Sequence, residues 1–352
     1  MRLDPDEMPS WLKAIPQSRS ERVVAGIDED DCAVLRLGQA LLIVTADYLN
    51  ARPIALELGL GGLEDLGRLN VLANLSDLCG TGAEPQAFMS AITMPREASQ
   101  EDFEQVMNGI VSECRKWGIP LVGGDTKLGA SMALLGIAIG SAKSEENLTL
   151  KRNAKVGDLI WLSGAVGGCN AAVLSLVEDI GVWGNREWAA DAILRPNLPL
   201  GYSREVSEGR LGHGGIDISD GLGNDLYRLA RASGVGLRIH ADNIPVSTEI
   251  QGIAKKIGVP AWAFSFGAGG DMQFVVTSPT KHAIAMESIG LSCIGEVLQE
   301  GQMTLEAGGV VGILPSGGHR DARRVSFAEE IRSLVISVAE EFNSQREKND
   351  WR

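Results

Sequence analysis

Two motifs rich in glycine and aspartate indicate the fold of this chain: Gly214-Gly-Ile-Asp-Ile-Ser-Asp-Gly-Leu-Gly-Asn-Asp225 and, in the first half, Gly123-Gly-Asp-Thr126. In each motif, an aspartate follows an apolar run of β-forming residues at a point where glycines predict a turn. A carboxylate at such a strand end leaves the sheet and points into a cleft instead of a core. The two motifs therefore predict strand ends with functional carboxylates in both halves of the chain.

Three further acidic sites repeat this pattern. The pair Asp30-Asp31 precedes a predicted strand, Asp47 follows a second predicted strand, and Asp77 lies in a predicted helix. So many neighbouring carboxylates would repel one another unless cations lay between them. Magnesium bound to a nucleotide polyphosphate meets this need, because this hard ion takes carboxylate oxygens while phosphates complete its coordination shell.

Each motif taken alone also has a purely structural interpretation. Residues 123–126 could form a turn with an Asx-type hydrogen bond, and Ser219 or Asp220 could cap a helix N-terminus. Residues 28–31 could be a solvated acidic loop. The pair Asn74 and Asp77, three residues apart on one helix face, could be the polar edge of a buried helix. The order and spacing of all the motifs together favour a common site.

The composition is that of a soluble protein with two domains. The chain has 352 residues, 44% of them hydrophobic, and 43 glycines, which suits an α/β or α+β fold with more than one core. A net charge of −14 argues against general nucleic-acid binding. No apolar run approaches the roughly 18 residues that span a bilayer, so no membrane association is expected. Five widely separated cysteines and an acidic N-terminus without a signal core predict a cytoplasmic protein with reduced thiols.

Hydrophobic periodicity predicts two successive mixed units. The first unit has predicted helices at 64–79 and 100–117 and predicted strands at 32–37, 41–44, 86–93, 119–122 and 131–139. The second unit has predicted strands at 159–162, 216–218, 272–277 and 293–297, with helices at 170–177 and starting near Leu222. The charged segment 141–158 predicts a domain boundary near Lys151. We therefore expect an N-terminal domain at 1–150, a C-terminal domain at 151–320, and a C-terminal amphipathic helix and tail at 321–352.

Together the motifs resemble those of the thiamine-monophosphate kinase family, within the group that also includes aminoimidazole ribonucleotide synthetase, selenophosphate synthetase and an ATP-dependent hydrogenase-maturation dehydratase. The matching segments occur in the family's order and are Asp30-Asp31-Cys-Ala-Val34, Thr45-Ala-Asp47, Asn74-Leu-Ser-Asp-Leu-Cys-Gly-Thr-Gly-Ala-Glu-Pro85, Gly123-Gly-Asp-Thr126, Arg152-Asn-Ala-Lys-Val-Gly-Asp158, Leu194-Arg-Pro196 and Asp217-Ile-Ser-Asp-Gly-Leu222. Selenophosphate synthetase and the dehydratase fit less well, because the sequence lacks the reactive N-terminal cysteine of the first and the C-terminal cysteine of the second.

The resemblance implies a two-domain fold of the aminoimidazole ribonucleotide synthetase type, α/β in its N-terminal half and α+β in its C-terminal half. ATP would bind between subunits, and Mg²⁺ would join its phosphates to aspartates. The implied metal ligands are Asp30, Asp31, Asp47, Asp77, Asp125 and Asp220, of which Asp125 and Asp220 would also be catalytic. The implied nucleotide-binding residues are Thr45, Asn74, Gly123, Gly124, Arg152 and Ser219.

The resemblance also implies a homodimer, in which strands of the N-terminal domains form a barrel across the interface. The predicted strands at 41–44, 86–93 and 131–139 are apolar on more than one face, as a shared barrel requires. An ordinary sheet buried within one subunit would show the same periodicity.

The motifs expected around the phosphate acceptor are altered. The family's glycine–valine–histidine–phenylalanine segment is replaced by Asn50-Ala-Arg-Pro-Ile54, and its glycine–glutamate–aspartate–tyrosine–glutamate motif keeps only Asp271. Arg52 suits bidentate binding of an anion and would repel the cationic thiazolium of thiamine, although it could equally be a surface residue on a loop. We therefore assign Arg52 and Asp271 to acceptor binding and regard the reaction class as better defined than the acceptor.

Three functions are consistent with the sequence. The first is an ATP- and Mg²⁺-dependent kinase that converts thiamine monophosphate to thiamine diphosphate. The second is an enzyme with the same ATP site that phosphorylates a different small acceptor, such as an anionic one. The third is a non-catalytic nucleotide-binding protein. The full set of mutually repelling aspartates disfavours the third function, because such a protein has no need of them.

Overall fold

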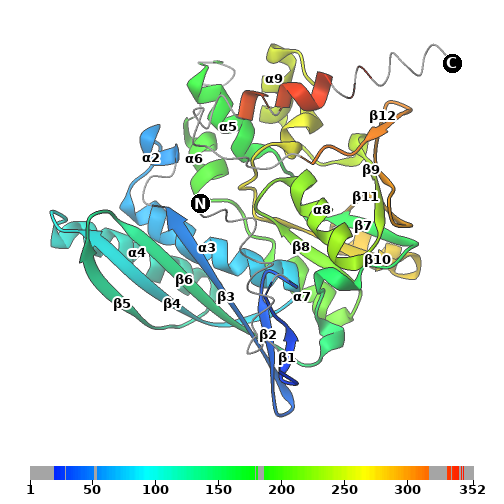
Figure 1. Cartoon of the computed structure of the whole chain (residues 1–352). Helices are drawn as coiled ribbons and strands as arrows, with labels where there is room; N and C mark the ends of the chain where they lie inside the picture. Colours follow the sequence, from blue (N-terminus) through cyan, green and yellow to red (C-terminus); the bar gives the residue numbers. More distant parts are fainter. Residues whose placement is uncertain are drawn as a thin grey trace, which may run out of the picture.

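The computed structural model describes residues 20–27, 29–50, 54–178, 180, 186–316, 331–333, 335–340, 342 and 344. These residues form two sheets, one in each half of the chain, with helices packed around them (Figure 1). The long helix α3 (Leu63–Thr81) runs along the first sheet and extends to the second. None of the described helices is long and apolar enough to cross a membrane.

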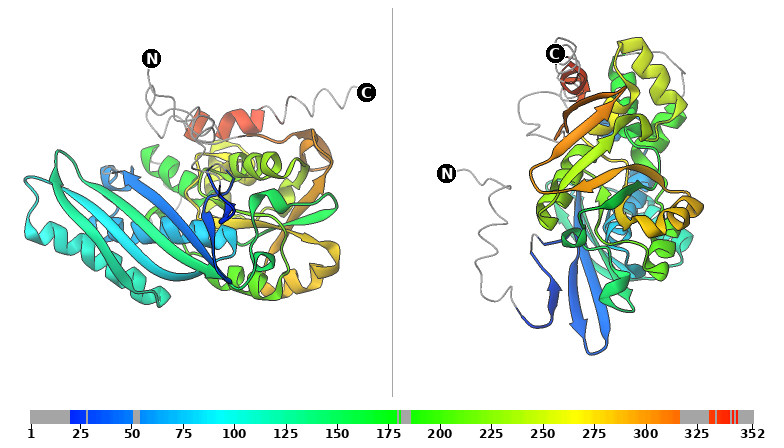
Figure 2. Two further views of the ribbon diagram at one scale, coloured as in Figure 1. Left: turned by 60° about the horizontal axis from the view of Figure 1, so that its bottom comes forward. Right: turned by 90° about the vertical axis from the view of Figure 1, so that its right-hand side faces the viewer.

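The N-terminal sheet has six strands in the order β1-β2-β3-β6-β4-β5, and all neighbours are antiparallel except β4 and β5. Its strands are β1 (Val23–Ala25), β2 (Ala33–Leu37), β3 (Ala40–Asn50), β4 (Glu84–Pro95), β5 (Leu121–Gly129) and β6 (Ala133–Ala142). Every second residue along most of β4 and β6 is buried, and α3 and α4 (Gln100–Trp117) pack on that face (Figure 2). The opposite face is less buried, so the sheet is amphipathic. The short helix α2 (Ile54–Glu57) precedes α3.

The C-terminal sheet has seven strands in the order β13-β12-β9-β11-β7-β10-β8, antiparallel except for β9 and β12. Its strands are β7 (Asp158–Leu162), β8 (Gly215–Ile218), β9 (Gly236–His240), β10 (Gln273–Pro279), β11 (Ser292–Leu298), β12 (Met303–Ala307) and β13 (Val310–Ile313). Its helices are α5 (Gly168–Val177), α6 (Arg186–Leu194), α7 (Leu200–Gly209), α8 (Leu222–Ser233), α9 (Thr248–Ile257) and α10 (Ala283–Ile289). A 3₁₀ turn, η3 (Lys151–Asn153), lies between the two sheets in sequence.

The end of α3 packs directly against β8 and so joins the two domains. A Cβ atom added to Gly80 would lie 2.4 Å from the backbone nitrogen of Asp217, so this approach requires glycine. The Thr149 hydroxyl donates a hydrogen bond of 2.9 Å to the Gly80 carbonyl oxygen, and the Ser203 hydroxyl donates one of 2.7 Å to that of Cys79. These bonds fix the last turn of α3, and with it Asp77, against the strand that carries Asp217.

Two predicted helices are confirmed, and one predicted turn is wrong. The helices predicted at 64–79 and 100–117 are present as α3 and α4. The turn predicted at residues 123–126 is wrong, because these residues lie within β5. Gly124 has a φ of +154°, and a Cβ there would lie 1.9 Å from the carbonyl oxygen of Ser90 on β4. This glycine therefore permits two paired strands to approach closely.

Two expectations about architecture also change. Because the N-terminal sheet is mostly antiparallel, both halves are α+β, and the α/β class expected for the first half is wrong. The described strands of this sheet form an open sheet and do not close into a barrel within one chain. Of the predicted tail helix, residues 331–333 and 335–340 are helical, with Ile331, Val335 and Val338 buried.

Replacing Gly80 with alanine should separate α3 from β8 and destabilise the protein by about 1–3 kcal/mol, because the new methyl group overlaps backbone atoms. Gly201 on α7 is a matched control, since a Cβ there meets no atom within 4 Å. Gly201→Ala should be neutral or stabilising by up to about 1 kcal/mol. Urea unfolding of both variants checks this prediction, and equal stabilities for the two variants would contradict it.

Candidate active site

Carboxylates from both domains gather where α3 meets β8. We call this group the acid cluster, and it comprises Asp30, Asp31, Asp47, Asp77, Asp217 and Asp220. Asp30 and Asp31 precede β2, Asp47 is on β3, and Asp77 is on α3. Asp217 lies on β8 and Asp220 in the loop before α8. Five of these six aspartates are those that the sequence singled out as metal ligands.

Two residues of β3 donate hydrogen bonds to two residues of α3. The hydroxyl of Thr45 donates a hydrogen bond of 2.5 Å to the carboxylate of Asp77. The backbone amide of Asp47 donates to Oδ1 of Asn74 at 3.0 Å. Asn74 and Asp77 are both buried on α3, and both accept hydrogen bonds from β3. These bonds fix the position of the Asp47 backbone and one oxygen of Asp77.

Asp217 is the most deeply buried carboxylate of the acid cluster. Its side chain is 1% exposed, and its Oδ2 atom accepts a 2.7 Å hydrogen bond from the hydroxyl of Ser76. Its Oδ1 atom is buried without a hydrogen-bond partner among the described residues. A buried carboxylate oxygen without a hydrogen-bond partner destabilises the folded state unless it binds a cation or a proton.

Lys151 on η3 binds both members of the N-terminal acidic pair. Its backbone amide donates to Asp30 at 2.8 Å, and its ammonium group lies 2.7 Å from Asp31. Thr81 at the end of α3 also donates to Asp30, at 3.2 Å. Residues 30 and 31 are therefore held against the domain junction and do not form a freely solvated loop.

The loop before α8 is held by residues inside the helix. The α8 N-cap is Gly221, which makes no side-chain capping bond, so the alternative interpretation of Ser219 or Asp220 as a cap is wrong. The backbone amide of Asp220 instead donates to the fully buried carboxylate of Asp225 at 3.1 Å. Arg228, one turn further on, contacts Asp31 at 2.8 Å and Asp220 at 3.3 Å.

Four carboxylates of the acid cluster, those of Asp30, Asp47, Asp77 and Asp217, have raised pKa values. Burial, followed by repulsion from neighbouring carboxylates, raises the pKa of Asp77 well above its usual range and also raises that of Asp47. Burial raises the pKa of Asp217 to about 7 and that of Asp30 to about 6; for Asp30, the nearby Lys151 charge lowers it in part. Divalent cations would relieve this repulsion, and an all-oxygen donor set suits Mg²⁺.

The fit of the donor set to Mg²⁺ rests on its chemistry and not on a preformed metal cage. No group of three acidic, histidine or cysteine side chains among the described residues forms such a cage. The unpartnered Oδ1 of Asp217 and the raised pKa values are nevertheless the features that a bound cation would remove. We conclude that the residues fit Mg²⁺ ions that arrive with phosphate oxygens to complete their shells.

A pocket with mostly basic walls opens beside the acid cluster. It encloses about 400 Å³ and is lined by Glu29, Asp30, Lys151, Arg152, Arg228, Arg231 and Ala232. We call it the cationic pocket. Arg152, predicted to approach nucleotide phosphates, is exposed at its wall. Four cationic side chains beside carboxylates suit a polyphosphate whose metal ions face the acid cluster.

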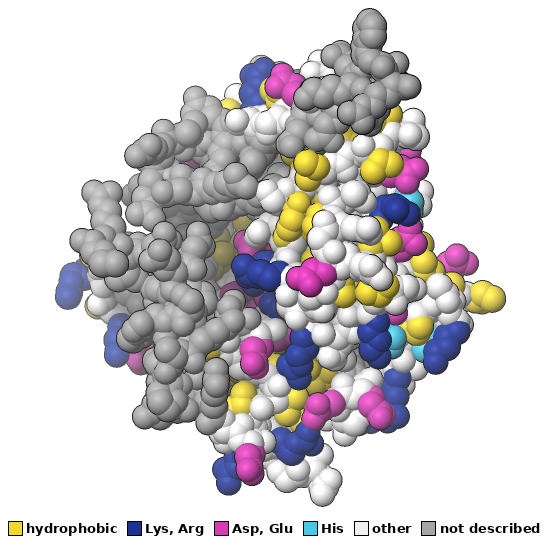
Figure 3. Space-filling view, turned by 45° about the vertical axis from the view of Figure 1, so that its right-hand side comes forward, with side chains coloured by type: hydrophobic (Ala, Val, Ile, Leu, Met, Phe, Trp, Pro, Cys, Tyr) yellow, Lys and Arg dark blue, Asp and Glu magenta, His cyan; other side chains and the backbone are white. Residues whose placement is uncertain are grey.

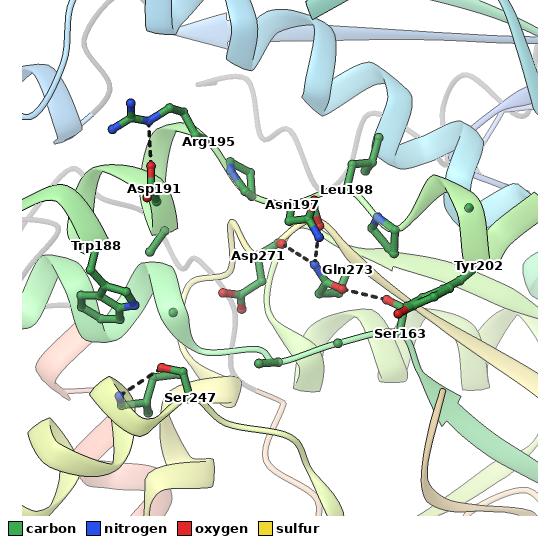
Figure 4. Close-up of a pocket in the computed structure, with 18 residues that line it drawn as sticks. Ser163, Trp188, Asp191, Arg195, Asn197, Leu198, Tyr202, Ser247, Asp271 and Gln273 are labelled. Atoms are coloured by element: carbon green, nitrogen blue, oxygen red, sulfur yellow. Dashed lines mark hydrogen bonds and ion pairs between the residues drawn. The ribbon is translucent and has the colours of Figure 1, made fainter. Parts of the chain in front are cut away.

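A larger pocket of about 930 Å³ lies in the C-terminal domain (Figure 4). Asp271 is at its centre, between Trp188 on one side and Tyr202 on the other. The Asp271 carboxylate accepts backbone hydrogen bonds from Gly167 at 2.7 Å and Cys169 at 3.3 Å, at the start of α5. Burial raises its pKa, and these bonds lower it in part. We call this space the Asp271 pocket.

The Asp271 pocket is connected to the acid cluster through the backbone. The carbonyl oxygen of Ser219 accepts a 2.9 Å hydrogen bond from the amide of Gly270, and that of Ile218 accepts one of 3.0 Å from Met272. The loop that carries Asp271 therefore runs beside the loop that carries Asp220.

Three predicted site residues lie apart from the cluster. Asp125 is on the edge strand β5, with its side chain 64% exposed and 3.3 Å from Lys127. Gly123 and Gly124 are exposed on the same strand. Arg52 is outside the described residues. One chain thus brings the other predicted metal-ligand aspartates together but leaves Asp125 outside the cluster.

Sequence reasoning missed four residues of this site: Lys151, Asp217, Asp225 and Arg228. Asp217 and Asp225 both lie within the 214–225 motif, so their spacing from Asp220 could have identified them. Lys151 directly precedes Arg152, but its contact with Asp31 spans the domain junction. Arg228 could have been found from its position three residues after Asp225 on one helix face.

Basic and acidic side chains are interspersed on one face of the molecule. On the face shown in Figure 3, the coloured Lys and Arg side chains alternate with Asp and Glu.

Known proteins are similar to this chain in sequence and in fold. The AIR synthase related protein family matches residues 29–142 with its N-terminal domain and residues 155–308 with its C-terminal domain. A thiamine-monophosphate kinase from Methanopyrus kandleri is 31% identical over 289 residues, which cover 82% of this chain and 87% of that protein. The crystal structure of thiamine-monophosphate kinase from Stenotrophomonas maltophilia K279a is 26% identical, with a TM-score of 0.67, covering 88% of this chain and 98% of that one. A structure of AaThiL complexed with AMPPCP and TMP is 22% identical, with a TM-score of 0.75, covering 90% and 98%.

The fold and the two matched domains define the class: the chain belongs to the AIR synthase related protein family. Within that class, it is a member of the thiamine-monophosphate kinase family, as its motifs predicted. The likeness to the AaThiL structure confirms the two-domain architecture.

Without Mg²⁺, the protein should lose stability as the pH rises from about 4 to about 7, between the ordinary pKa of 3.8 and the raised pKa values of Asp30 and Asp217. The folded-state pKa values of Asp30 and Asp217 lie above their ordinary value of 3.8, so the folded state binds more protons than the unfolded state in this range. Urea unfolding in EDTA at several pH values measures the decline.

Saturating Mg²⁺ should remove most of this decline, and the Asp217→Asn variant should show a shallower one in EDTA. A metal-free stability that stays constant or increases over the same pH range would contradict the account of the buried carboxylates.

Proposed function

We propose that this protein is an ATP- and Mg²⁺-dependent thiamine-monophosphate kinase, which converts thiamine monophosphate to thiamine diphosphate. The observation that carries the proposal is the acid cluster, built from both domains, directly beside the cationic pocket. Phosphoryl transfer depends mainly on positioning and charge neutralisation, and these two features supply both. Relatives named thiamine-monophosphate kinase, at about 30% identity over most of the chain, support the choice of acceptor.

In this reaction, the terminal phosphoryl group leaves ATP and joins a phosphate oxygen of the acceptor, so one P–O bond breaks, one forms and ADP is released. Lys151, Arg152 and Arg231 would bind the polyphosphate in the cationic pocket. The acid cluster would hold Mg²⁺ ions, which supply charge neutralisation when bound. Thr45 orients Asp77 through its 2.5 Å hydrogen bond, so that one carboxylate oxygen remains available to a metal ion.

The acceptor site is proposed to be the Asp271 pocket. Its charged lining residues are Asp271, Asp191 and Arg195, and Arg195 is paired with Asp191 at 2.9 Å. The lining therefore carries a net negative charge beside two aromatic rings, which suits a cationic heteroaromatic group such as a thiazolium. The negative lining of the pocket favours thiamine monophosphate over the anionic acceptor that Arg52 suggested.

We propose in addition that the protein acts as a homodimer whose subunits share a barrel. Tyr48, Val122 and Leu128 are 63%, 55% and 59% exposed, although they lie on strands of a regular sheet. By strand register, Tyr48 lies on the open face of the sheet and Leu128 on the helix side of the edge strand β5, so a partner could cover the open face and this edge. The separation of Asp125 from the acid cluster supports the same proposal, because a second copy could bring its Asp125 to the site.

The metal ligands can be tested by direct assay. Purified protein with ATP, Mg²⁺ and thiamine monophosphate should form thiamine diphosphate. Asp77→Asn and Asp217→Asn should each lower kcat by roughly 100-fold or more, because an amide keeps the shape of the carboxylate but not its charge. Asp242→Asn, at an aspartate that accepts a backbone bond from Gly308, is the matched control and should keep full activity. Near-normal turnover in both site variants would refute the proposal.

The contribution of Asp125 can be tested by mixing two inactive variants. If Asp125 acts on the partner's site, then a dimer of one Asp77→Asn and one Asp125→Asn subunit contains one intact site of its two. Equal mixing with subunit exchange should therefore restore about a quarter of the wild-type activity. Mixed dimers that form but remain inactive would show that Asp125 does not act across the interface.

A further inference from the structure

Arg228 on α8 contacts three carboxylates from both halves of the chain. Its guanidinium group lies 2.8 Å from Asp31, 3.3 Å from Asp220 and 3.5 Å from Asp225. Asp31 lies between β1 and β2 of the N-terminal sheet, whereas Asp220 and Asp225 belong to the C-terminal domain. One cationic side chain therefore bridges the two domains within the acid cluster.

The position of Arg228 is fixed by the helix that carries it. Asp225 and Arg228 are three residues apart on one face of α8. Asp225 is fully buried, and it also accepts the backbone amide of Asp220. The same buried carboxylate thus positions both the guanidinium group of Arg228 and the backbone of the loop that bears Asp220.

The contacts of Arg228 use one oxygen of each proposed metal ligand. Oδ1 of Asp31 accepts from Arg228 at 2.8 Å and from Lys151 at 2.7 Å, and Oδ2 of Asp220 accepts from Arg228 at 3.3 Å. Among the described hydrogen bonds, none uses Asp31 Oδ2 or Asp220 Oδ1. Each carboxylate therefore keeps one oxygen for a metal ion while Arg228 holds the other.

The charge of Arg228 has two opposing consequences for the site. Before a metal ion binds, this charge offsets part of the repulsion among Asp31, Asp220 and the buried Asp217. When a divalent cation approaches the same carboxylates, the guanidinium group repels it and competes for their negative charge. The repulsion of the metal ion should outweigh the relief of carboxylate repulsion. The fold already holds three of the carboxylates by other contacts, which come from Lys151, Thr45 and Ser76.

We propose that Arg228 is the resident counter-cation of the acid cluster: it stabilises the metal-free junction of the two domains and raises the Mg²⁺ concentration that the site requires. It is a positioning residue, which acts through Asp31 and Asp220. This inference rests on the proposed Mg²⁺ site, so its test measures metal binding directly and not only activity.

The test compares full-length Arg228→Gln, Arg228→Lys and wild-type protein, all purified with Mg²⁺ and then dialysed. Calorimetric titration with Mg²⁺ alone gives affinity, and thermal unfolding in EDTA gives metal-free stability. Arg228→Gln should bind Mg²⁺ at least ~10-fold more tightly and unfold at a lower temperature in EDTA. Arg228→Lys keeps the charge and should restore both values toward the wild type. Arg238→Gln removes an arginine paired with Glu296 on a neighbouring strand and should change Mg²⁺ affinity less than about twofold.

Three results would refute either the inference or the metal site on which it rests. Equal or weaker Mg²⁺ binding by Arg228→Gln would overturn the inference, because the charge would then not oppose the metal. Failure of Arg228→Gln to fold even with Mg²⁺ would also overturn it, since a counter-cation should be replaceable by the metal. Absence of Mg²⁺ binding by the wild-type protein, both alone and together with a non-hydrolysable ATP analogue, would instead refute the proposed metal site itself.

Discussion

The close packing of α3 against β8 is the contact on which the rest of the site depends. Because Gly80 places no side chain between helix and strand, Asp77 and Asp217 are buried near each other although they belong to different domains. Burial and the surrounding carboxylates raise the pKa values of both. A fold that keeps these groups together requires positive charge close by, and this requirement explains the arrangement of the residues around them.

The positive charge comes from two sources with different roles. Lys151 and Arg228 belong to the protein and contact the acid cluster through Asp31 and Asp220. They also line the cationic pocket, where a polyphosphate would bring Mg²⁺ to the inner carboxylates. The domain junction thus combines a site for phosphate oxygens with a site for metal ions, while the Asp271 pocket offers a separate space for an acceptor.

Much of the acid cluster could be predicted from the sequence, because its aspartates occupy motifs in a fixed order and spacing. The contacts of Arg228 and Lys151 with Asp31 could not, since they join residues far apart in sequence across the domain junction. The turn expected at residues 123–126 failed for a local reason: a glycine pair there serves strand pairing as well as it serves a turn. The helices α3 and α4 were predictable because their apolar residues repeat with helical spacing.

The central claim is that the acid cluster accepts a nucleotide polyphosphate only together with divalent cations. Calorimetric titration of the wild-type protein with a non-hydrolysable ATP analogue, in Mg²⁺ and in EDTA, tests it most directly. The account predicts that the analogue binds at least ~10-fold more tightly with Mg²⁺, because its phosphates otherwise face uncompensated carboxylates. Equal affinity in Mg²⁺ and in EDTA would contradict it.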